Sequence, residues 1–132
     1  MSIVVGFVTT REGRAALRFA VQEAKRRGSD LVVINSQRGG HGPEETHVDA
    51  VLAEAKRELE EFGVKFITRA LVREHDPAED VVDVADEIGA ECIVIGLRRR
   101  SPVGKLVMGS NAQRILLDAT CPVISVKADP HD

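Results

Sequence analysis

The segment from Gly96 to Asn111 carries the residues of this sequence that are best suited to chemistry. Three consecutive arginines, residues 98–100, and Lys105 lie there between glycines, in a chain of 132 residues whose net charge is −3. Glycines allow backbone amides to approach an anion closely, and the planar guanidinium group of arginine pairs with phosphate oxygens. A helix that begins at Ser110 would add unpaired amides and the positive end of its dipole. The segment therefore predicts a site for a phosphate group.

Two common nucleotide-binding motifs do not fit the sequence. In a P-loop, the pair Gly104-Lys105 would be followed by Ser or Thr, which holds magnesium, but this chain has Leu106 there. Arg99 replaces the earlier glycine of that motif. The turn after the first apolar run reads GFVTTREG and lacks the dinucleotide fingerprint G-x-G-x-x-G. The sequence therefore argues against a P-loop ATPase and offers no dinucleotide fingerprint.

The same residues also have structural interpretations. Runs of like charge usually face water, so residues 98–100 also fit a solvated surface or a partner-binding patch. Ser110 with Gln113 three residues later is typical of a capping box, a role compatible with a phosphate contact. Lys105 fits a surface charge better than a catalytic group. The residues alone leave these alternatives open.

Composition and charge argue against several classes of function. Aromatic residues make up 3% of the chain, without Trp or Tyr, whereas proteins that bind single-stranded nucleic acids stack bases on aromatic side chains. The negative net charge also opposes a nucleic-acid partner. Apolar runs fall short of the roughly 20 residues of a membrane span, and nothing resembles a signal peptide. We expect a cytoplasmic protein with neither a nucleic-acid nor a membrane partner.

Cysteine, histidine and acidic residues offer little for catalysis or metal binding. Cys92 and Cys121 are too few for a disulfide framework, so we expect two buried or partly buried thiols in a reducing compartment. The four histidines lack metal-ligand spacing, and no Ser-His-Asp or Cys-His arrangement is evident. The acidic residues between Glu79 and Glu87 fit the polar face of a helix. We therefore expect no catalytic residues and no metal held by side chains.

Apolar runs and helical patterns alternate along the chain. Short β-branched runs predict strands, and apolar residues at i, i+3, i+4 and i+7 predict helices between them. Asp76 with Pro77 suits a helix start, and Gly28, Gly63 and Gly89 suit helix ends. The strands are expected at residues 2–8, 30–36, 64–72, 92–95 and 123–127, and the helices at 9–28, 48–63, 76–89 and 110–120. This order predicts one α/β domain, residues 1–132, with a parallel sheet and helices on both faces.

The C-terminal segment IVIGLRRRSPVGKLVMGSNAQRILLDATCPVISVK carries a recognisable pattern. Gly96, Gly109 and Ser110 match a signature of a glycine, two residues, a glycine, nine residues, then a glycine and a small hydroxyl residue. Arg99 replaces the middle glycine. With NAQRILLDA and CPVISVK, the segment resembles the C-terminal signature of the universal stress protein family, and the order of elements matches over the whole chain. The resemblance implies a Rossmann-like sheet of five parallel strands in the order 3-2-1-4-5.

The resemblance also implies an adenine-nucleotide site. ATP-binding members place adenine between the ends of the first two strands and the phosphates on the glycine loop. The contacts that this implies are Gly6, Phe7, Val8, Ser36, Ile95, Gly96, Arg98, Arg99, Arg100, Gly109, Ser110 and Asn111. The family's first strand usually ends in an aspartate followed by Gly-Ser, whereas this chain has Val8, Thr9 and Thr10. The aspartate's contact with the nucleotide is therefore lost unless Thr9 or Thr10 replaces it.

A regulatory role follows from this resemblance. ATP or a related adenine nucleotide would be a bound ligand, with any Mg²⁺ held by the phosphates and water. We expect no efficient turnover, because no residue is assignable as the base that activates water. The alternatives are a nucleotide-independent interaction module with a blocked pocket, motivated by Val8 and Arg99, and a slow ATPase or phosphotransfer enzyme.

The resemblance also implies a homodimer. Family members commonly dimerise through the last strand, and an exposed sheet edge invites pairing with another strand. The residues expected at that interface are Val123, Ile124, Ser125 and Val126.

Overall fold

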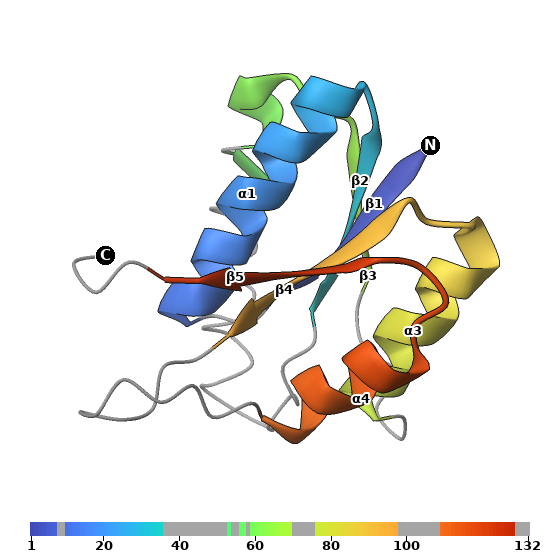
Figure 1. Cartoon of the computed structure of the whole chain (residues 1–132). Coiled ribbons are helices and arrows are strands. Elements are labelled where there is room, and N and C mark those ends of the chain that lie inside the picture. The colour runs from blue at the N-terminus through green and yellow to red at the C-terminus, as the bar shows by residue number, and fades with distance from the viewer. Residues whose placement is uncertain are drawn as a thin grey trace.

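Five parallel strands form one sheet in the order β3-β2-β1-β4-β5, which confirms the predicted topology (Figure 1). The structure is a computed structural model, and it describes residues 1–7, 10–35, 53, 56–57, 59–69, 76–97 and 109–128. The strands are β1 (Ser2–Phe7), β2 (Asp30–Asn35), β3 (Phe66–Arg69), β4 (Cys92–Leu97) and β5 (Val123–Lys127).

The two central strands, β1 and β4, are buried on both faces. Residues 3–5 of β1 and residues 93–94 of β4 have no exposed surface. β1 runs parallel to both of its neighbours, with Val5 opposite Val33 of β2 and Val94 of β4. Strands covered on both faces are nearly continuous apolar runs, which is why SIVVGF and CIVI show no polar alternation.

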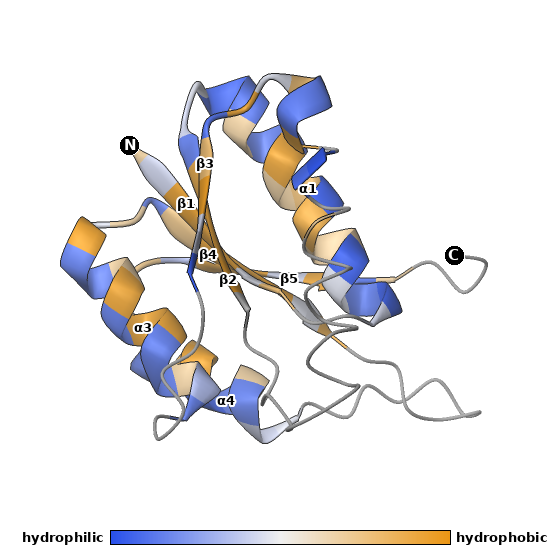
Figure 2. Ribbon diagram, turned by 180° about the vertical axis from the view of Figure 1, so that it is seen from behind, coloured by the Kyte–Doolittle hydropathy of each residue, from blue (hydrophilic) through white to orange (hydrophobic). Residues whose placement is uncertain are grey.

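Helices cover both faces of the sheet, as predicted. α1 (Arg11–Arg27) lies on one face, and α3 (Pro77–Ile88) and α4 (Ser110–Asp118) lie on the other (Figures 1 and 2). Figure 2 shows that the hydrophobic sides of α1 and α3 face the strands. Within the helix predicted at residues 48–63, the described residues 53, 56, 57 and 59–62 are helical.

The start of α3 and the glycines that end α1 and α3 confirm the boundaries expected from the sequence, whereas α1 begins at Arg11 rather than at residue 9. The Thr10 hydroxyl accepts a hydrogen bond from the Gly13 amide at the start of α1, and α3 begins with Asp76 as its cap and Pro77 in its first turn. Both helices end at glycines with positive φ, 67° at Gly28 and 62° at Gly89. L side chains rarely adopt this left-handed conformation, so glycine is the suitable residue at both ends.

A separate hydrophobic cluster lies on each face of the sheet. Alternate residues of β1 supply both clusters, because successive side chains of a strand point to opposite faces. Ile3, Val5 and Phe7 pack beneath α1, whereas Val4 packs beneath α3 and α4. The helices contribute Ala16, Leu17, Ala20, Val21 and Ala24 to the first cluster, and Ala78, Val81, Val82, Ala85 and Ile115 to the second.

One strand differs in extent from the prediction. The described part of the third strand, β3, is shorter than the predicted 64–72, whose residues 70–72 lie outside the described ranges. In α4, Ile115 is buried, whereas its neighbour Leu116 is 41% exposed. None of the helices within the described ranges is long and apolar enough to cross a membrane.

Candidate site at the carboxyl ends of β1 and β4

A small cavity lies where β1 and β4 end and α4 begins. Its volume is about 90 Å³. The strand ends supply Gly6, Ile95 and Gly96 to its lining, and the helices supply Pro77, Ala78, Asn111, Ala112 and Ile115. Sites for a whole small molecule usually have roughly 300–1,000 Å³, so the cavity among the described residues is too small to enclose one by itself. The position is the one where open α/β sheets bind ligands.

The start of α4 presents backbone amides without a side-chain cap. Gly109 is the capping residue, and within the described part of the chain no side chain bonds to this helix start as a cap. The Gly109 carbonyl accepts from the Gln113 amide at 3.1 Å, which is the first bond of the helix. The amides of residues 110–112 precede that bond, so they have no partner within the helix. Such a helix start attracts an anion through its amides and its dipole.

The capping box predicted at Ser110 and Gln113 is wrong. Gly109 has the extended conformation of a cap, with φ −66° and ψ 160°, and Ser110 is already the first helical residue. A side chain caps a helix from the residue with non-helical backbone, one position before Ser110. The Ser110 hydroxyl is therefore not committed to the capping role that its spacing from Gln113 suggested.

Gly96 is required by packing as well as suited to a ligand site. A Cβ atom on this residue would lie 2.4 Å from the Glu12 carbonyl oxygen and 2.6 Å from the Glu12 carbonyl carbon. The first turn of α1 therefore packs directly on the backbone of β4, and a backbone obstacle cannot rotate away as a side chain does. The contact between α1 and β4 therefore explains why residue 96 is a glycine. The sequence alone did not reveal this reason.

The structure brings four of the predicted contact residues to the cavity. Gly6, Ile95, Gly96 and Asn111 line it, and Gly109 and Ser110 lead into the helix that borders it. The Phe7 side chain points instead into the hydrophobic cluster beneath α1, so it does not line this cavity. The predicted contacts Val8, Ser36, Arg98, Arg99 and Arg100 lie outside the described residues.

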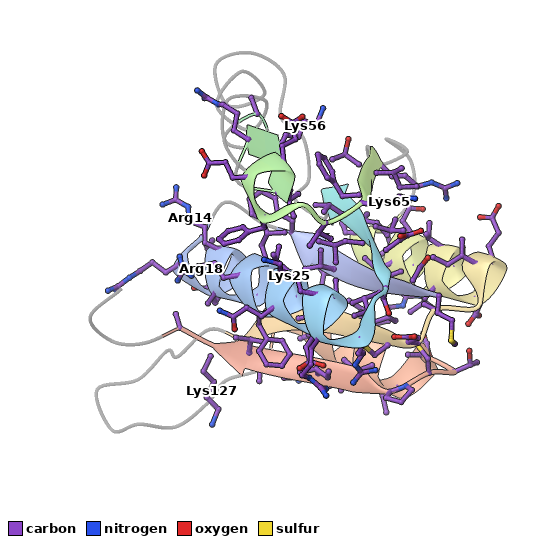
Figure 3. All side chains as sticks on the ribbon, turned by 90° about the horizontal axis from the view of Figure 1, so that it is seen from above. Arg14, Arg18, Lys25, Lys56, Lys65 and Lys127 are labelled. Carbon is purple, nitrogen blue, oxygen red and sulfur yellow. The ribbon has the colours of Figure 1, made fainter. Side chains whose placement is uncertain are left out.

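The described lining of the cavity is mostly apolar. None of the described lining residues carries a charge. The basic side chains Arg14, Arg18 and Lys25 project from α1, which covers the opposite face of the sheet from α4 (Figure 3). Any attraction for phosphate within the described residues therefore comes from the amides and dipole of α4.

A second hollow on the α1 side has a different character. A groove of about 390 Å³ lies between α1 and residues 59–62, and its lining includes the hydrophobic residues Leu17, Val21 and Leu59. Phe62 at its edge is 50% exposed, and the Lys25 ammonium group lies 5.2 Å from the centre of the Phe62 ring. This groove lies away from the strand ends and shares no residue with the cavity beside α4.

Both cysteines are free, as expected, and have packing positions. Cys92 is buried beneath α1, whereas Cys121 is half-buried on the opposite face beside α3 and α4. Burial raises the pKa of both thiols, so both are protonated near neutral pH. Within the described ranges, no cluster of three or more His, Cys, Asp and Glu residues forms a metal site.

The family model of the universal stress proteins matches residues 1–127. This chain belongs to the universal stress protein family. The match extends over both strand ends, the three arginines at residues 98–100 and the start of α4. It therefore confirms the resemblance that the glycine spacing and the C-terminal segment indicated.

Similar universal stress proteins span nearly the whole chain. A universal stress protein of Mycolicibacterium smegmatis is 42% identical over 135 residues, covering 98% of each chain. The structure of a universal stress protein from Archaeoglobus fulgidus has a TM-score of 0.79 and 37% identity, covering 96% of this chain and 97% of that chain. A second Archaeoglobus fulgidus structure, a complex with dAMP, has a TM-score of 0.74, 32% identity and 96% coverage of both chains.

Sequence reasoning missed Pro77 and Ala78, which line the cavity from the start of α3. It also missed Arg114, which links α4 to that same start. A signal for both was available in the predicted topology of this universal stress protein. Because α3 follows β3 in a parallel sheet, its first turn must lie at the same end of the sheet as the start of α4.

Proposed function

We propose that this protein binds ATP or a related adenine nucleotide as a regulatory ligand. The observation that carries the proposal is the start of α4, whose amides at residues 110–112 lack side-chain caps and lie beside the cavity at the ends of β1 and β4. An uncapped helix start at this end of a parallel sheet suits a phosphate group. Glycine at 109 allows close approach, because its Cβ position is open among the described residues.

The nucleotide class is supported by a related structure and by the sequence between β4 and α4. The Archaeoglobus fulgidus universal stress protein in complex with dAMP is 32% identical to this chain. The chain places three arginines, residues 98–100, between β4 and α4, where cations would complement the charge of a phosphate chain. Together, these features favour an adenine nucleotide with one or more phosphates, with any Mg²⁺ held by the phosphates and water.

We propose a binding role rather than efficient turnover. Hydrolysis of ATP needs a residue that orients or deprotonates the attacking water. The described residues lining the cavity include no carboxylate and no histidine. Asp76 and Glu79, the carboxylates that flank Pro77 and Ala78 in sequence, both pair with Arg114, and Asp76 also accepts from the Ala78 amide. The role would be to set conformation or partner choice in a stress response.

Calorimetry on the purified chain tests the proposal directly. ATP, AMP and cyclic AMP are titrated in turn, and thermal unfolding is followed with and without each ligand, because a ligand that binds the folded state raises its stability. We expect saturable heat and a raised melting temperature with at least one nucleotide. No heat and no thermal shift with any of the three would favour a nucleotide-independent interaction module. Mass spectrometry of the native protein adds a check for a co-purified nucleotide.

The β5 edge supports a proposal about assembly. β5 is the last strand of the sheet, and the Pro122 carbonyl before it accepts from the Ile93 amide at 2.9 Å. Because the bonding direction alternates along a strand, the amides of Val123 and Ser125 face away from β4. We propose a homodimer through residues 123–126, and light scattering on the wild type and on Ser125→Pro tests it. A wild type that remains monomeric at high micromolar concentration would contradict the dimer.

We also propose that the protein acts in the cytoplasm. The adenine nucleotide that it would bind is abundant there, and its two cysteines are unpaired, which suits a reducing compartment. Fractionation of cells that express the chain with a C-terminal tag tests this, and recovery in an extracellular fraction would contradict it.

A further inference from the structure

Arg114, in the second turn of α4, links this helix to the first turn of α3. Its Nη1 atom donates to Asp76 Oδ2 at 2.8 Å, and its Nη2 atom donates to Glu79 Oε1 at 2.8 Å. Its Nε atom also lies 3.8 Å from Asp118 Oδ2, one turn later on α4. Two nitrogens of one planar guanidinium group thus donate to two carboxylates at the start of a different helix. Because the group is planar, these bonds fix the direction of the link between α3 and α4 as well as its length.

The Asp76 carboxylate has a second task on the same helix. Its Oδ1 atom accepts from the Ala78 amide at 2.9 Å and so caps α3, while Oδ2 accepts from Arg114. The residues immediately after the cap, Pro77 and Ala78, line the cavity at the strand ends. A single carboxylate therefore connects the wall of the cavity formed by α3 to α4.

Arg114 is also close in the chain to the opposite wall. Asn111 and Ala112, which precede Arg114 on α4 by three and two residues, line the cavity, and so does Ile115, the residue after it. The four residues Asp76, Glu79, Arg114 and Asp118 thus form a cluster that joins both walls, here called the α3–α4 clamp.

We propose that Arg114 is a positioning residue of the nucleotide site, which holds the uncapped first turn of α4 at the spacing and angle that the phosphates need. The inference rests on the proposed function. Arg114 acts through the helix rather than by touching the nucleotide, since its guanidinium group is engaged by Asp76 and Glu79. Its side chain is 46% exposed, and exposed ion pairs contribute little to folding. The effect on the site is therefore expected to exceed the effect on stability.

Calorimetric affinities for adenosine and for ATP show whether Arg114 affects the binding of the phosphates or of the whole nucleotide. For Arg114→Ala, we expect ATP affinity to fall about tenfold while adenosine affinity stays within about twofold, because adenosine lacks the phosphates that meet α4. Arg114→Lys keeps the charge but has no planar fork, so we expect a loss of about threefold. Arg26→Ala is the matched control, because Arg26 also pairs with a carboxylate but lies in the last turn of α1.

A double variant, Asp76→Asn with Glu79→Ala, distinguishes positioning from simple attraction of charges. It removes two negative charges near the site, and charge alone predicts tighter binding of ATP. Loss of the α3–α4 clamp predicts weaker binding instead, and we expect about a fivefold loss. Asparagine caps a helix as well as aspartate does, so α3 keeps its first turn in this variant.

Each outcome decides between the possibilities. Wild-type protein that binds neither adenosine nor ATP would overturn the proposed function, and this inference with it. If the wild type binds ATP and Arg114→Ala binds it equally well, the function stands and the positioning role is wrong. Equal losses for adenosine and ATP, with a lowered melting temperature, would show a general structural role. Tighter ATP binding by the double variant would likewise overturn the inference.

Discussion

Two glycines of the same family pattern, Gly96 and Gly109, have different surroundings. A Cβ atom on Gly96 would collide with the backbone of Glu12, whereas a Cβ atom on Gly109 would have no neighbour within 4 Å among the described residues. Gly96 therefore holds α1 against β4, and Gly109 leaves open the space in front of α4. The comparison teaches that a glycine in a binding signature can be retained for the fold, for the ligand or for both.

The largest effect is expected from Gly96→Ala. The added methyl group must displace the backbone of α1, and overpacking of this kind costs about 3 kcal/mol of the free energy of unfolding. Urea unfolding measures the loss. Gly109→Ala is the matched control and is expected to cost less than about 1 kcal/mol, because alanine is only a poorer cap than glycine. Equal losses for the two variants would contradict the difference between the two sites.

Gly109→Asp is expected to separate stability from binding. The new carboxylate would cap α4 and raise the free energy of unfolding by a few tenths of a kcal/mol, since Asp is a better cap than Gly. It would also occupy the amides and repel phosphate, so ATP affinity should fall more than tenfold, about 1.4 kcal/mol.

Calorimetry and urea unfolding on the same preparation give both quantities for this variant. Gly109→Asn, a neutral cap, shows how much of the loss comes from occupied amides rather than from charge. ATP affinity equal to that of the wild type in both variants would mean that the amides of α4 are not the phosphate site.

Thr10→Ala, at the start of α1, is expected to lower stability and leave ATP binding almost unchanged. Its hydroxyl accepts from the Gly13 amide at 3.1 Å, and loss of such a cap costs about 1 kcal/mol. ATP affinity should remain within about twofold, because the hydroxyl already serves the helix. Thr10→Ser keeps the cap and is the control. A large loss of ATP affinity in Thr10→Ala, with stability intact, would instead make Thr10 the substitute for the missing aspartate.

The last turn of α1, far from both glycines, is expected to matter least. Hydrogen bonds from Arg26 and Arg27 lower the pKa of Glu23 below its ordinary 4.5. The stabilisation is therefore present above the pKa of the unfolded chain and is lost as the pH falls through the lowered value. Glu23→Gln should lower the urea midpoint slightly at pH 7, and the difference from wild type should vanish once the pH lies well below the lowered pKa. Glu60→Gln is the control, and a difference that persists in acid would contradict the assignment.

Local signals in the sequence predicted most of the fold. The cap at Asp76 and the glycines that end α1 and α3 follow from patterns that act over a few residues, whereas the strand order was implied by the family resemblance. The position of α4 was also right, but its cap was misplaced by one residue. Ser110 and Gln113 have the capping-box spacing whether the helix begins at Ser110 or after it, so spacing alone could not decide.

The features of the site that depend on contacts between distant segments were not predictable in the same way. The approach of Glu12 to Gly96 and the link from Arg114 to Asp76 join residues far apart in the sequence. The spacing of apolar residues along the sequence does not predict these contacts, because they depend on how α1, α3 and α4 pack on the sheet. The family signature named Gly96 correctly as a special position without revealing that α1 is one reason for it.

Backbone amide shifts measured by NMR during an ATP titration test the central proposal most directly. The proposal predicts saturable shifts at residues 110–112 of α4 and at Gly6 and Gly96, with Gly28 and Gly89 at the opposite helix ends unchanged. The proposal would be contradicted if saturable binding shifted the amide signals of residues that line the groove between α1 and residues 59–62 and left those of residues 110–112 unchanged.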